Sequence, residues 1–211
     1  MSPSLPPPAQ KRPWYLFAAL VAGWIYGAQA LSEGYDIIAY YRGEQADVHA
    51  LADDVHDGKT RESITSLADR WVALKDASKG REYPLGVASL LLGGAMILFA
   101  ARSMAGREGA RSALIQVVLV HGGVVVAWYL LTMDATRAWV TFAEAIHEAL
   151  ARLAGEKIPP EWERASQAAA RLGPAIAIAV RSVASGLIIL ALTRPRARAF
   201  FESVPPQLGE G

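Results

Sequence analysis

The sequence predicts an all-α, polytopic membrane protein with four transmembrane helices and a helical extension outside the membrane that closes as a four-helix bundle. Three observations support this fold class. Hydrophobic residues make up 53% of the 211 residues and are concentrated in four long segments. One of them, residues 114–131, contains no Asp, Glu, Lys or Arg, and about 20 apolar helical residues cross a hydrocarbon core of roughly 30 Å. The polar segments between them repeat their apolar residues at helical spacing.

The composition excludes several classes of partner and site. The formal net charge is +1 and no basic stripe stands out, which argues against nucleic acid as a partner. The chain has no cysteine, so disulfides, thiolate metal sites and thiol nucleophiles are excluded. Arginine outnumbers lysine and alanine is abundant, a bias typical of GC-rich bacterial genomes. We therefore expect a bacterial inner-membrane protein in a lipid bilayer.

The N-terminal segment contains a tail and an apolar stretch. Residues 1–13 are rich in proline and predict a disordered cytoplasmic tail. Residues 14–31 predict the first transmembrane helix, with Trp14 and Tyr15 at the interface. A secretory signal peptide is the alternative, because basic residues precede the stretch and Ala28-Gln29-Ala30 has the form of a cleavage site. The stretch is long for a signal peptide, which favours the uncleaved helix.

The polar segment 32–83 predicts a pair of helices outside the membrane. Its apolar residues recur every three or four positions on both sides of residues 57–60, which separate the two helices. Thr60 is the expected cap of the second helix, and Gly80 is expected to end it. The residues that define the two apolar stripes are Ile38, Tyr41, Val48, Ala52 and Val55, and then Ile64, Leu67, Trp71 and Leu74.

Three further transmembrane helices are expected. Pro84 opens the second helix, since a proline is well placed in the first turn, where its missing N–H would have no partner. Gly173-Pro174 in the same way separates the fourth helix from the segment before it. The expected boundaries are 84–101, 112–132 and 174–193 for the helices, 102–111 for the loop before the third helix, and 194–211 for the tail.

The segment 133–173 predicts the second pair of outer helices. Residues 134–153 form an amphipathic helix that either stands alone or continues the third transmembrane helix as one long helix. Residues 155–160 end it, and a short helix over 161–172 follows. Two helices from each half of the chain then give the four-helix bundle. Its expected core is Ile64, Leu67, Trp71, Trp139 and Phe142.

The charges in the short connections predict the topology. With four crossings, all of the basic clusters that flank the apolar segments fall on one side, which the positive-inside rule makes cytoplasmic. Both termini are then cytoplasmic, and the segments 32–83 and 133–173 are periplasmic. The clusters are Lys11 and Arg12; Arg102, Arg107 and Arg111; and Arg194, Arg196 and Arg198.

Arg181 is a charged residue inside the fourth apolar segment. It follows the start of that segment by about seven residues, roughly 10 Å at 1.5 Å per residue. A charge facing lipid near the centre of a bilayer costs at least ~2.5 kcal/mol on insertion scales, so the side chain should face protein, water or the interface. It either reaches headgroup phosphates or pairs with an acid at the outer rim, or it contacts an anion or acts in gating. The candidate acids are Asp134, Glu33 and Asp36.

His121 lies in the middle of the third apolar segment, next to Gly122 and Gly123. One interpretation is a hydrogen bond between helices, and the other is a proton relay or a ligand site. On antiparallel helices His121 and Arg181 differ in depth by only about 5–6 Å, so a transport pathway would place both in one polar pocket. The candidate hydrogen-bond partners of His121 are Ser89, Ser182, Ser185 and Gln116.

A weak metal-binding pattern occurs in the first outer pair. If residues 38–55 form a helix that continues to residue 56, then His49, Asp53 and His56 share one face, where two imidazoles and a carboxylate could hold a divalent ion such as zinc. The alternative is a solvated acidic face, and no cofactor is otherwise expected. Residues that would complete the coordination are Glu144, His147 and Glu148.

The function that the sequence favours is that of a non-enzymatic membrane subunit. Small residues in the apolar segments allow close helix packing, and they include Gly23, Gly27, Gly93, Gly123 and Gly186. No nucleophile elbow or phosphate-binding loop is present, so an enzyme is disfavoured. We expect an interaction or assembly protein that docks a protein partner or a second copy through its outer helices and small-residue faces. The alternatives are a small transporter or channel component with a polar pocket of His121 and Arg181, and a periplasmic metal sensor.

Overall fold

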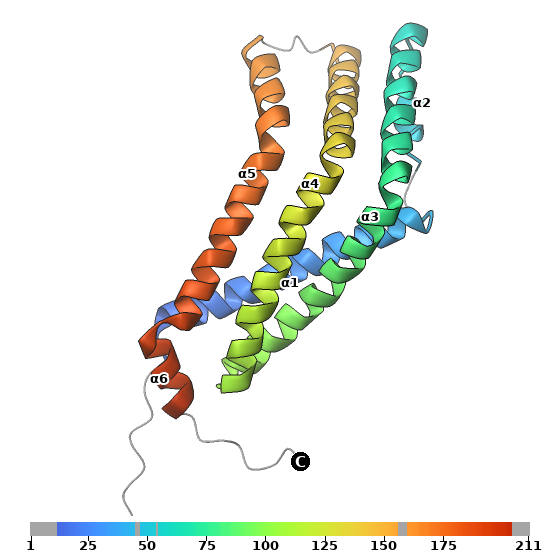
Figure 1. Cartoon of the computed structure of the whole chain (residues 1–211). Coiled ribbons are helices and arrows are strands. Elements are labelled where there is room, and N and C mark those ends of the chain that lie inside the picture. The colour runs from blue at the N-terminus through green and yellow to red at the C-terminus, as the bar shows by residue number, and fades with distance from the viewer. Residues whose placement is uncertain (1–11, 45–46, 54, 156–159, 204–211) are drawn as a thin grey trace, which may run out of the picture. The chain divides into compact units, whose positions relative to one another are not determined.

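The computed structural model is built from helices (Figure 1). It describes residues 12–44, 47–53, 55–155 and 160–203, and in these ranges it contains no strand. The all-α prediction is therefore confirmed. Four of the helices, α1, α3, α4 and α5, are long and apolar enough to cross a membrane. The helices are α1 (Trp14–Tyr41), α2 (Ala50–Asp53), α3 (Gly58–Met104), α4 (Glu108–Leu153), α5 (Pro160–Thr193) and α6 (Pro195–Ser203).

Two predicted helix breaks are absent, because α3 and α5 continue through Pro84 and Pro174. A proline inside a helix removes one hydrogen bond to the carbonyl four residues earlier. In α3 that carbonyl belongs to Gly80. Gly80, the predicted end of one helix, and Pro84, the predicted start of the next, therefore lie in the same turn of one continuous helix. Long apolar helices tolerate such a turn when the helices around them hold it. The alternative in which the third apolar segment continues outward as one helix is confirmed by α4.

The segment after α1 contains less helix than its periodicity predicts. The spacing of apolar residues predicts one helix over 38–55, whereas α1 ends at Tyr41 and α2 has only four residues. Gly43 has a φ of 74°, in the left-handed region that favours glycine, and this conformation turns the chain out of the helix. Asp47 then accepts a hydrogen bond from the backbone N–H of His49 at 2.9 Å, as in a turn.

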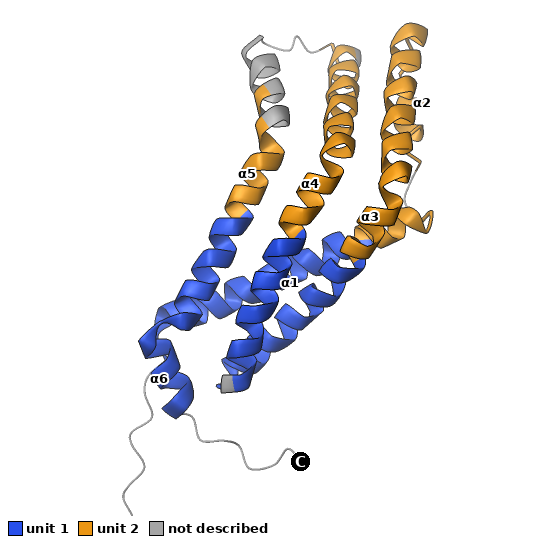
Figure 2. Ribbon diagram, viewed as in Figure 1, with its two compact units in different colours: residues 1–35, 87–124, 181–211 blue, residues 36–86, 125–180 orange. Residues whose placement is uncertain are grey.

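The chain forms two compact units (Figure 2). Unit 1 is Met1–Tyr35, Val87–Val124 and Arg181–Gly211, and unit 2 is Asp36–Gly86 and Val125–Val180. Each of the four long helices contributes residues to both units.

The core of unit 1 includes a close crossing of α1 and α3. A Cβ atom added to Gly93 would lie 2.5 Å from the backbone nitrogen of Leu31 and 2.7 Å from the carbonyl oxygen of Gly27. The two helix backbones therefore touch, which only glycine allows. Around this crossing, apolar residues from α1, α3, α4, α5 and α6 form one buried cluster, whose largest fully buried members are Leu16, Leu20, Met96, Leu114, Leu192 and Phe201.

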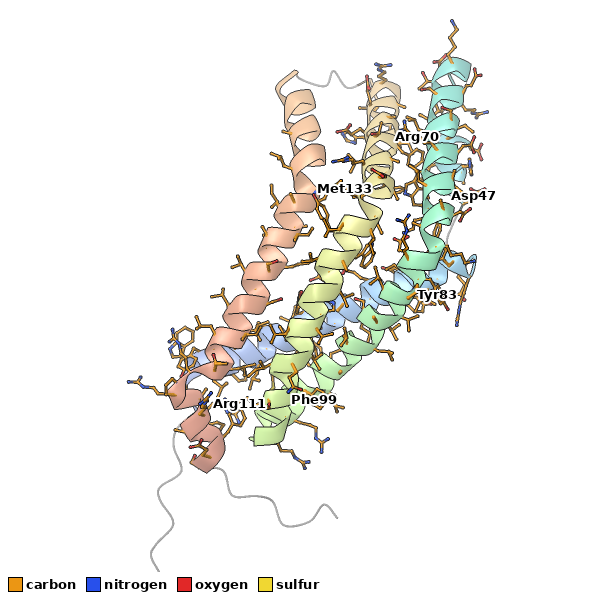
Figure 3. The ribbon with its side chains drawn as sticks, viewed as in Figure 1. Asp47, Arg70, Tyr83, Phe99, Arg111 and Met133 are labelled. Carbon is orange, nitrogen blue, oxygen red and sulfur yellow. The ribbon has the colours of Figure 1, made fainter. Side chains whose placement is uncertain are left out.

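Arginines join three parts of the chain at one end of unit 1. Arg12 donates a hydrogen bond to the carbonyl oxygen of Met104, the last residue of α3. Arg111, which is labelled in Figure 3, donates to the carbonyl oxygen of Leu192 near the end of α5 at 3.0 Å. The last carbonyls of a helix have no partner within it and carry partial negative charge, so both arginines act as C-terminal caps.

The core of unit 2 contains the predicted residues Ile64 and Phe142, both fully buried, with Leu67 packed against them. Trp71 and Trp139 were also predicted for this core but are not part of it: their ring centroids lie 4.9 Å apart, Trp71 is half-buried and Trp139 is 39% exposed. This core comes from α2, α3 and α4. The side chains of the predicted fourth bundle helix, residues 161–172, lie outside the described residues except for Ala168 and Leu172, which are exposed, and residues 173–180 of α5 contain no buried side chain.

Candidate functional site

His121 is the most buried titratable side chain in unit 1, with 1% of its surface exposed. The hydroxyl of Ser89 lies 3.2 Å from Nε2 of His121 and 3.1 Å from the carbonyl oxygen of Ala30. A serine hydroxyl has one proton, and the carbonyl can only accept, so Ser89 donates to Ala30 and accepts from an Nε2–H group. The Nδ1 atom therefore carries the lone pair, and it has no hydrogen-bond partner among the described residues.

The ring of Tyr26 packs against His121 with its centroid 5.1 Å from that of the imidazole, in an edge-to-face arrangement. This site joins three helices, because Tyr26 and Ala30 belong to α1, Ser89 to α3 and His121 to α4. The predicted hydrogen bond between helices is confirmed, and Ser89 is its partner among the four candidates. The function of the site as a proton relay or ligand site stays a prediction.

Arg181 forms an ion pair with Glu33, also within unit 1. Its Nη1 donates to Oε2 of Glu33 at 2.9 Å, and its Nη2 donates to Oε1. The pair is thus bidentate, the geometry in which an arginine fork matches a carboxylate best. Both side chains are largely buried, with 25% and 26% exposed. The prediction of an acid partner is confirmed for Glu33, while the predicted pocket shared by Arg181 and His121 stays a prediction.

We expect each single substitution in this pair to destabilise the protein more than the double substitution. Glu33→Leu and Arg181→Leu each leave a charge without its partner and should lower the free energy of unfolding by about 1–3 kcal/mol. The double leucine variant should lie close to the wild type, because a buried ion pair gains little over apolar side chains of similar size. Chemical denaturation in detergent micelles measures the four proteins as a double-mutant cycle. Additive losses would contradict the pairing.

Unit 2 contains a polar network that the sequence did not predict. Glu82, which is 2% exposed, accepts hydrogen bonds from the hydroxyl of Tyr41 at 2.5 Å and of Ser78 at 3.2 Å. Lys75 forms an ion pair with the other carboxylate oxygen, and its Nζ lies 5.3 Å from the ring centroid of Tyr40. Burial and the hydrogen bond to Glu82 raise the pKa of Tyr41, so this phenol stays protonated and donates. The network ties the end of α1 to α3.

A sequence signal for this network exists. Lys75 and Glu82 are seven residues apart, two helical turns, so they lie on the same face of α3. Opposite charges at that spacing are compatible with a pair, but such charges also occur on solvated faces, and only the packing of α1 against α3 buries them.

The proposed metal ligands lie in different local structures. His49 precedes α2, Asp53 is its last residue and His56 follows it, so the three do not share one helix face. His49 instead binds two carboxylates, with Nδ1 2.8 Å from Asp47 and Nε2 2.9 Å from Asp69. Among the described residues no group of three or more His, Cys, Asp or Glu side chains is arranged to hold a metal ion. The metal site stays a prediction.

The His49 arrangement predicts a pH dependence of stability. Both ring nitrogens face carboxylate acceptors, first of all Asp69 and then Asp47, and these hydrogen bonds raise the pKa of His49 above its ordinary value of 6.5. The stabilisation is therefore complete below that ordinary value and is lost as the pH rises through the raised pKa. We expect the melting temperature of the wild type, relative to that of His49→Asn, to fall from about pH 5 to about pH 8, the range in which histidine titrates.

Thermal unfolding followed by circular dichroism across this range tests the prediction. His147→Asn, at an exposed histidine of α4, is the control and should keep the wild-type profile. The carboxyl group of Asp47 affects stability in the opposite direction and at lower pH. Hydrogen bonds from His49 lower the pKa of Asp47, so the contribution of Asp47 to stability is lost only as the pH falls through that lowered pKa. Identical profiles for the wild type and His49→Asn would contradict the bridging role.

The small residues predicted for packing divide into two groups. Gly27 and Gly93 form the backbone crossing in unit 1, and a Cβ at Gly23 would lie 3.8 Å from Leu114. A Cβ at Gly123 or Gly186 would meet no described atom within 4 Å. The first group is used in packing within the chain, and the second faces open space.

A groove of about 640 Å³ lies between α3 and α4 in unit 2. Its apolar lining residues are leucines and alanines, and its charged residues are Arg70, Arg137 and Asp134, with 4.0 Å between Arg137 and Asp134. The residues that line it are Leu67, Arg70, Ala73, Leu74, Asp134, Arg137, Ala138 and Thr141.

No protein-family model matches the sequence, and no curated protein or solved structure matches it.

Proposed function

We propose that the chain is a multi-pass protein of the bacterial inner membrane. The distribution of side chains in unit 1 supports this assignment. Large apolar residues are exposed, among them Leu91 at 65%, Leu119 at 58% and Leu187 at 61%, whereas Ser89 and His121 are buried. In water this arrangement would leave a broad apolar surface uncovered, and a hydrocarbon core covers it without loss.

The orientation follows from the basic residues of the connections. The positive-inside rule makes the side with Arg12, the α3–α4 loop and the residues after α5 cytoplasmic, together with both termini. The outer parts of α3 and α4, with the unit 2 core, are then periplasmic. Reporter fusions after residues 106 and 155 test this topology, and a periplasmic signal at residue 106 would contradict it.

Within this membrane setting, we assign the protein an interaction or assembly role that needs no catalysis. One observation supports this function. The partly buried charges of Arg181 and Glu33 pair with each other in unit 1, whereas two glycines on its apolar helices face open space. Arg181 is neutralised by Glu33, and Gly123 and Gly186 remain open. Open glycines on apolar helices allow the close approach of another helix. The groove between α3 and α4 offers a second contact surface to a protein partner outside the membrane.

Replacing Gly186 by leucine tests this function. A Cβ added at Gly186 meets no described atom within 4 Å, so the fold should persist, but a partner helix could no longer approach. Ala177→Leu is the control, because residue 177 is exposed and lies nine positions away, on the opposite face of α5. We expect a stoichiometric protein, or a second copy, to co-purify from native membranes with the wild type and Ala177→Leu and to be lost with Gly186→Leu. A wild type that purifies as a monomer would refute the proposal.

A transporter or channel component is the second candidate, and the unpartnered Nδ1 atom of His121 favours it. A proton is the ligand that this atom binds most directly. We therefore expect proteoliposomes containing a pH-sensitive dye to show proton flux with the wild type and none with His121→Leu. Flux no greater than in empty liposomes would exclude proton transport.

A further inference from the structure

Helix α6 has a buried apolar face with an exposed arginine at each edge of that face. It begins at Pro195, two residues after α5 ends at Thr193. Ala197, Phe200 and Phe201 are buried in the core of unit 1, whereas Arg196 and Arg198 are exposed. The sequence predicts only a tail over residues 194–211, although the apolar residues of this segment recur at helical spacing.

Stacked arginines hold α6 in place. The guanidinium of Arg12 lies 5.2 Å from the ring centroid of Phe200, and that of Arg111 lies 5.7 Å from the ring of Phe201. These cation–π contacts hold the two rings in place, and they engage the charges of both arginines within the protein. Arg196 and Arg198 have no hydrogen bond or ion pair with any residue that the structure describes. They are presented on a fixed helix and remain available to an anion.

The surface next to α6 is apolar. On α5, Leu187 and Leu190 are 61% and 53% exposed. On α1, Trp14 is 82% exposed, and its neighbour Tyr15 stacks with Arg194 at 5.3 Å. Along the chain, exposed apolar residues are followed within two turns by exposed arginines. This is the order of groups in a phospholipid, in which acyl chains adjoin a phosphate. Tryptophan is typical of the same boundary.

We propose that the exposed side of α6, which Arg196 and Arg198 flank at its two edges, binds the headgroups of anionic phospholipids. This inference rests on the proposed membrane location. Acyl chains lie along the apolar surface of α5. Because residues two apart point about 200° apart around a helix, the two guanidinium groups bind phosphates at the two edges of the exposed side. Glu202 is the acid on this helix, and it lies four residues after Arg198, toward the end away from α5.

The double variant Arg196→Gln/Arg198→Gln tests the proposal on the full-length protein. Purified protein in detergent is titrated with phosphatidylglycerol and with phosphatidylcholine, and bound lipids are counted by native mass spectrometry. We expect the wild type to prefer phosphatidylglycerol. The variant should raise the Kd for this lipid roughly 30-fold, from about fivefold for each arginine near an anionic surface, with no change for phosphatidylcholine. Arg61→Gln/Arg152→Gln, at two exposed arginines of unit 2 that lie outside the groove, is the matched control and should behave as the wild type.

An unchanged preference in the α6 variant would overturn the proposal. The same conclusion follows if glycerol 3-phosphate, which lacks acyl chains, binds the wild type as tightly as the lipid does, since the ligand would then be a soluble anion. Retention of the protein in carbonate-washed vesicles is measured in parallel. Loss from the vesicles would overturn the membrane location and this inference together, whereas an unchanged lipid preference in a retained protein overturns the inference alone.

Discussion

Replacing Glu82 by alanine is expected to lower the free energy of unfolding by about 3–5 kcal/mol, the range found when one partner of a buried ion pair is removed. The carboxylate is 2% exposed and Lys75 is 15% exposed, so the remaining ammonium group would be left in a largely dry site. The hydroxyls of Tyr41 and Ser78 would lose the carboxylate as an acceptor and keep the carbonyl oxygen of Lys75, at 2.9 Å and 2.8 Å. Chemical denaturation in micelles, followed by circular dichroism, measures the change.

Two controls separate the ion pair from the loss of a side chain. Glu62→Ala removes an exposed glutamate of the same helix and should change stability by at most about 0.5 kcal/mol. Lys75→Met combined with Glu82→Leu removes both charges and should recover most of the stability. If Glu82→Ala costs no more than Glu62→Ala, the network does not hold α1 to α3.

Gly93→Ala is expected to destabilise unit 1, while the adjacent Gly94→Ala is expected to have no effect or to stabilise it. A Cβ at Gly93 meets backbone atoms of α1 at 2.5 Å and 2.7 Å, and backbone cannot move aside without separating the helices. Overpacking of this kind costs about 1–3 kcal/mol and sometimes more. At Gly94 the nearest atom is a side-chain carbon 4.0 Å away, so the usual gain of about 0.5–1 kcal/mol for alanine in a helix applies.

The two glycines are therefore a matched pair, one residue apart on the same helix. Thermal unfolding of both variants in the same detergent makes the comparison. Equal effects would mean that α1 and α3 do not cross at this position.

The elements and several contacts could be predicted from the sequence because they depend on local pattern and on a short list of partners. The apolar segments indicated the four long helices. The isolation of His121 and Arg181 among apolar residues required hydrogen-bond or charge partners, and the acids and serines at similar depth were few. Ser89 and Glu33 were both on those lists. Choosing the partner from each list requires the rotation of each helix about its own axis, which the sequence pattern does not give.

The remaining differences have physical reasons of their own. Pro84 and Pro174 were read as helix starts, but the hydrogen bonds of the neighbouring turns and the packing of α3 and α5 hold a continuous helix around them. Glu82 was read as part of a solvated segment, because burial of a charge depends on a partner that comes from another helix. Helix α6 was overlooked because its arginines dominated the pattern, although Phe200 and Phe201 carry most of its apolar surface.

The aromatic stacking at α6 sets the limit to which the chain can be shortened. A chain cut after Thr193 would keep all four long apolar helices, yet it would withdraw Phe200 and Phe201 from the core of unit 1. Arg12 and Arg111 would then lose the rings on which their guanidinium groups lie, while still capping α3 and α5. Affinity tags and fusion partners for this protein therefore belong after residue 203, and the nine residues of α6 have to be kept in any expressed fragment.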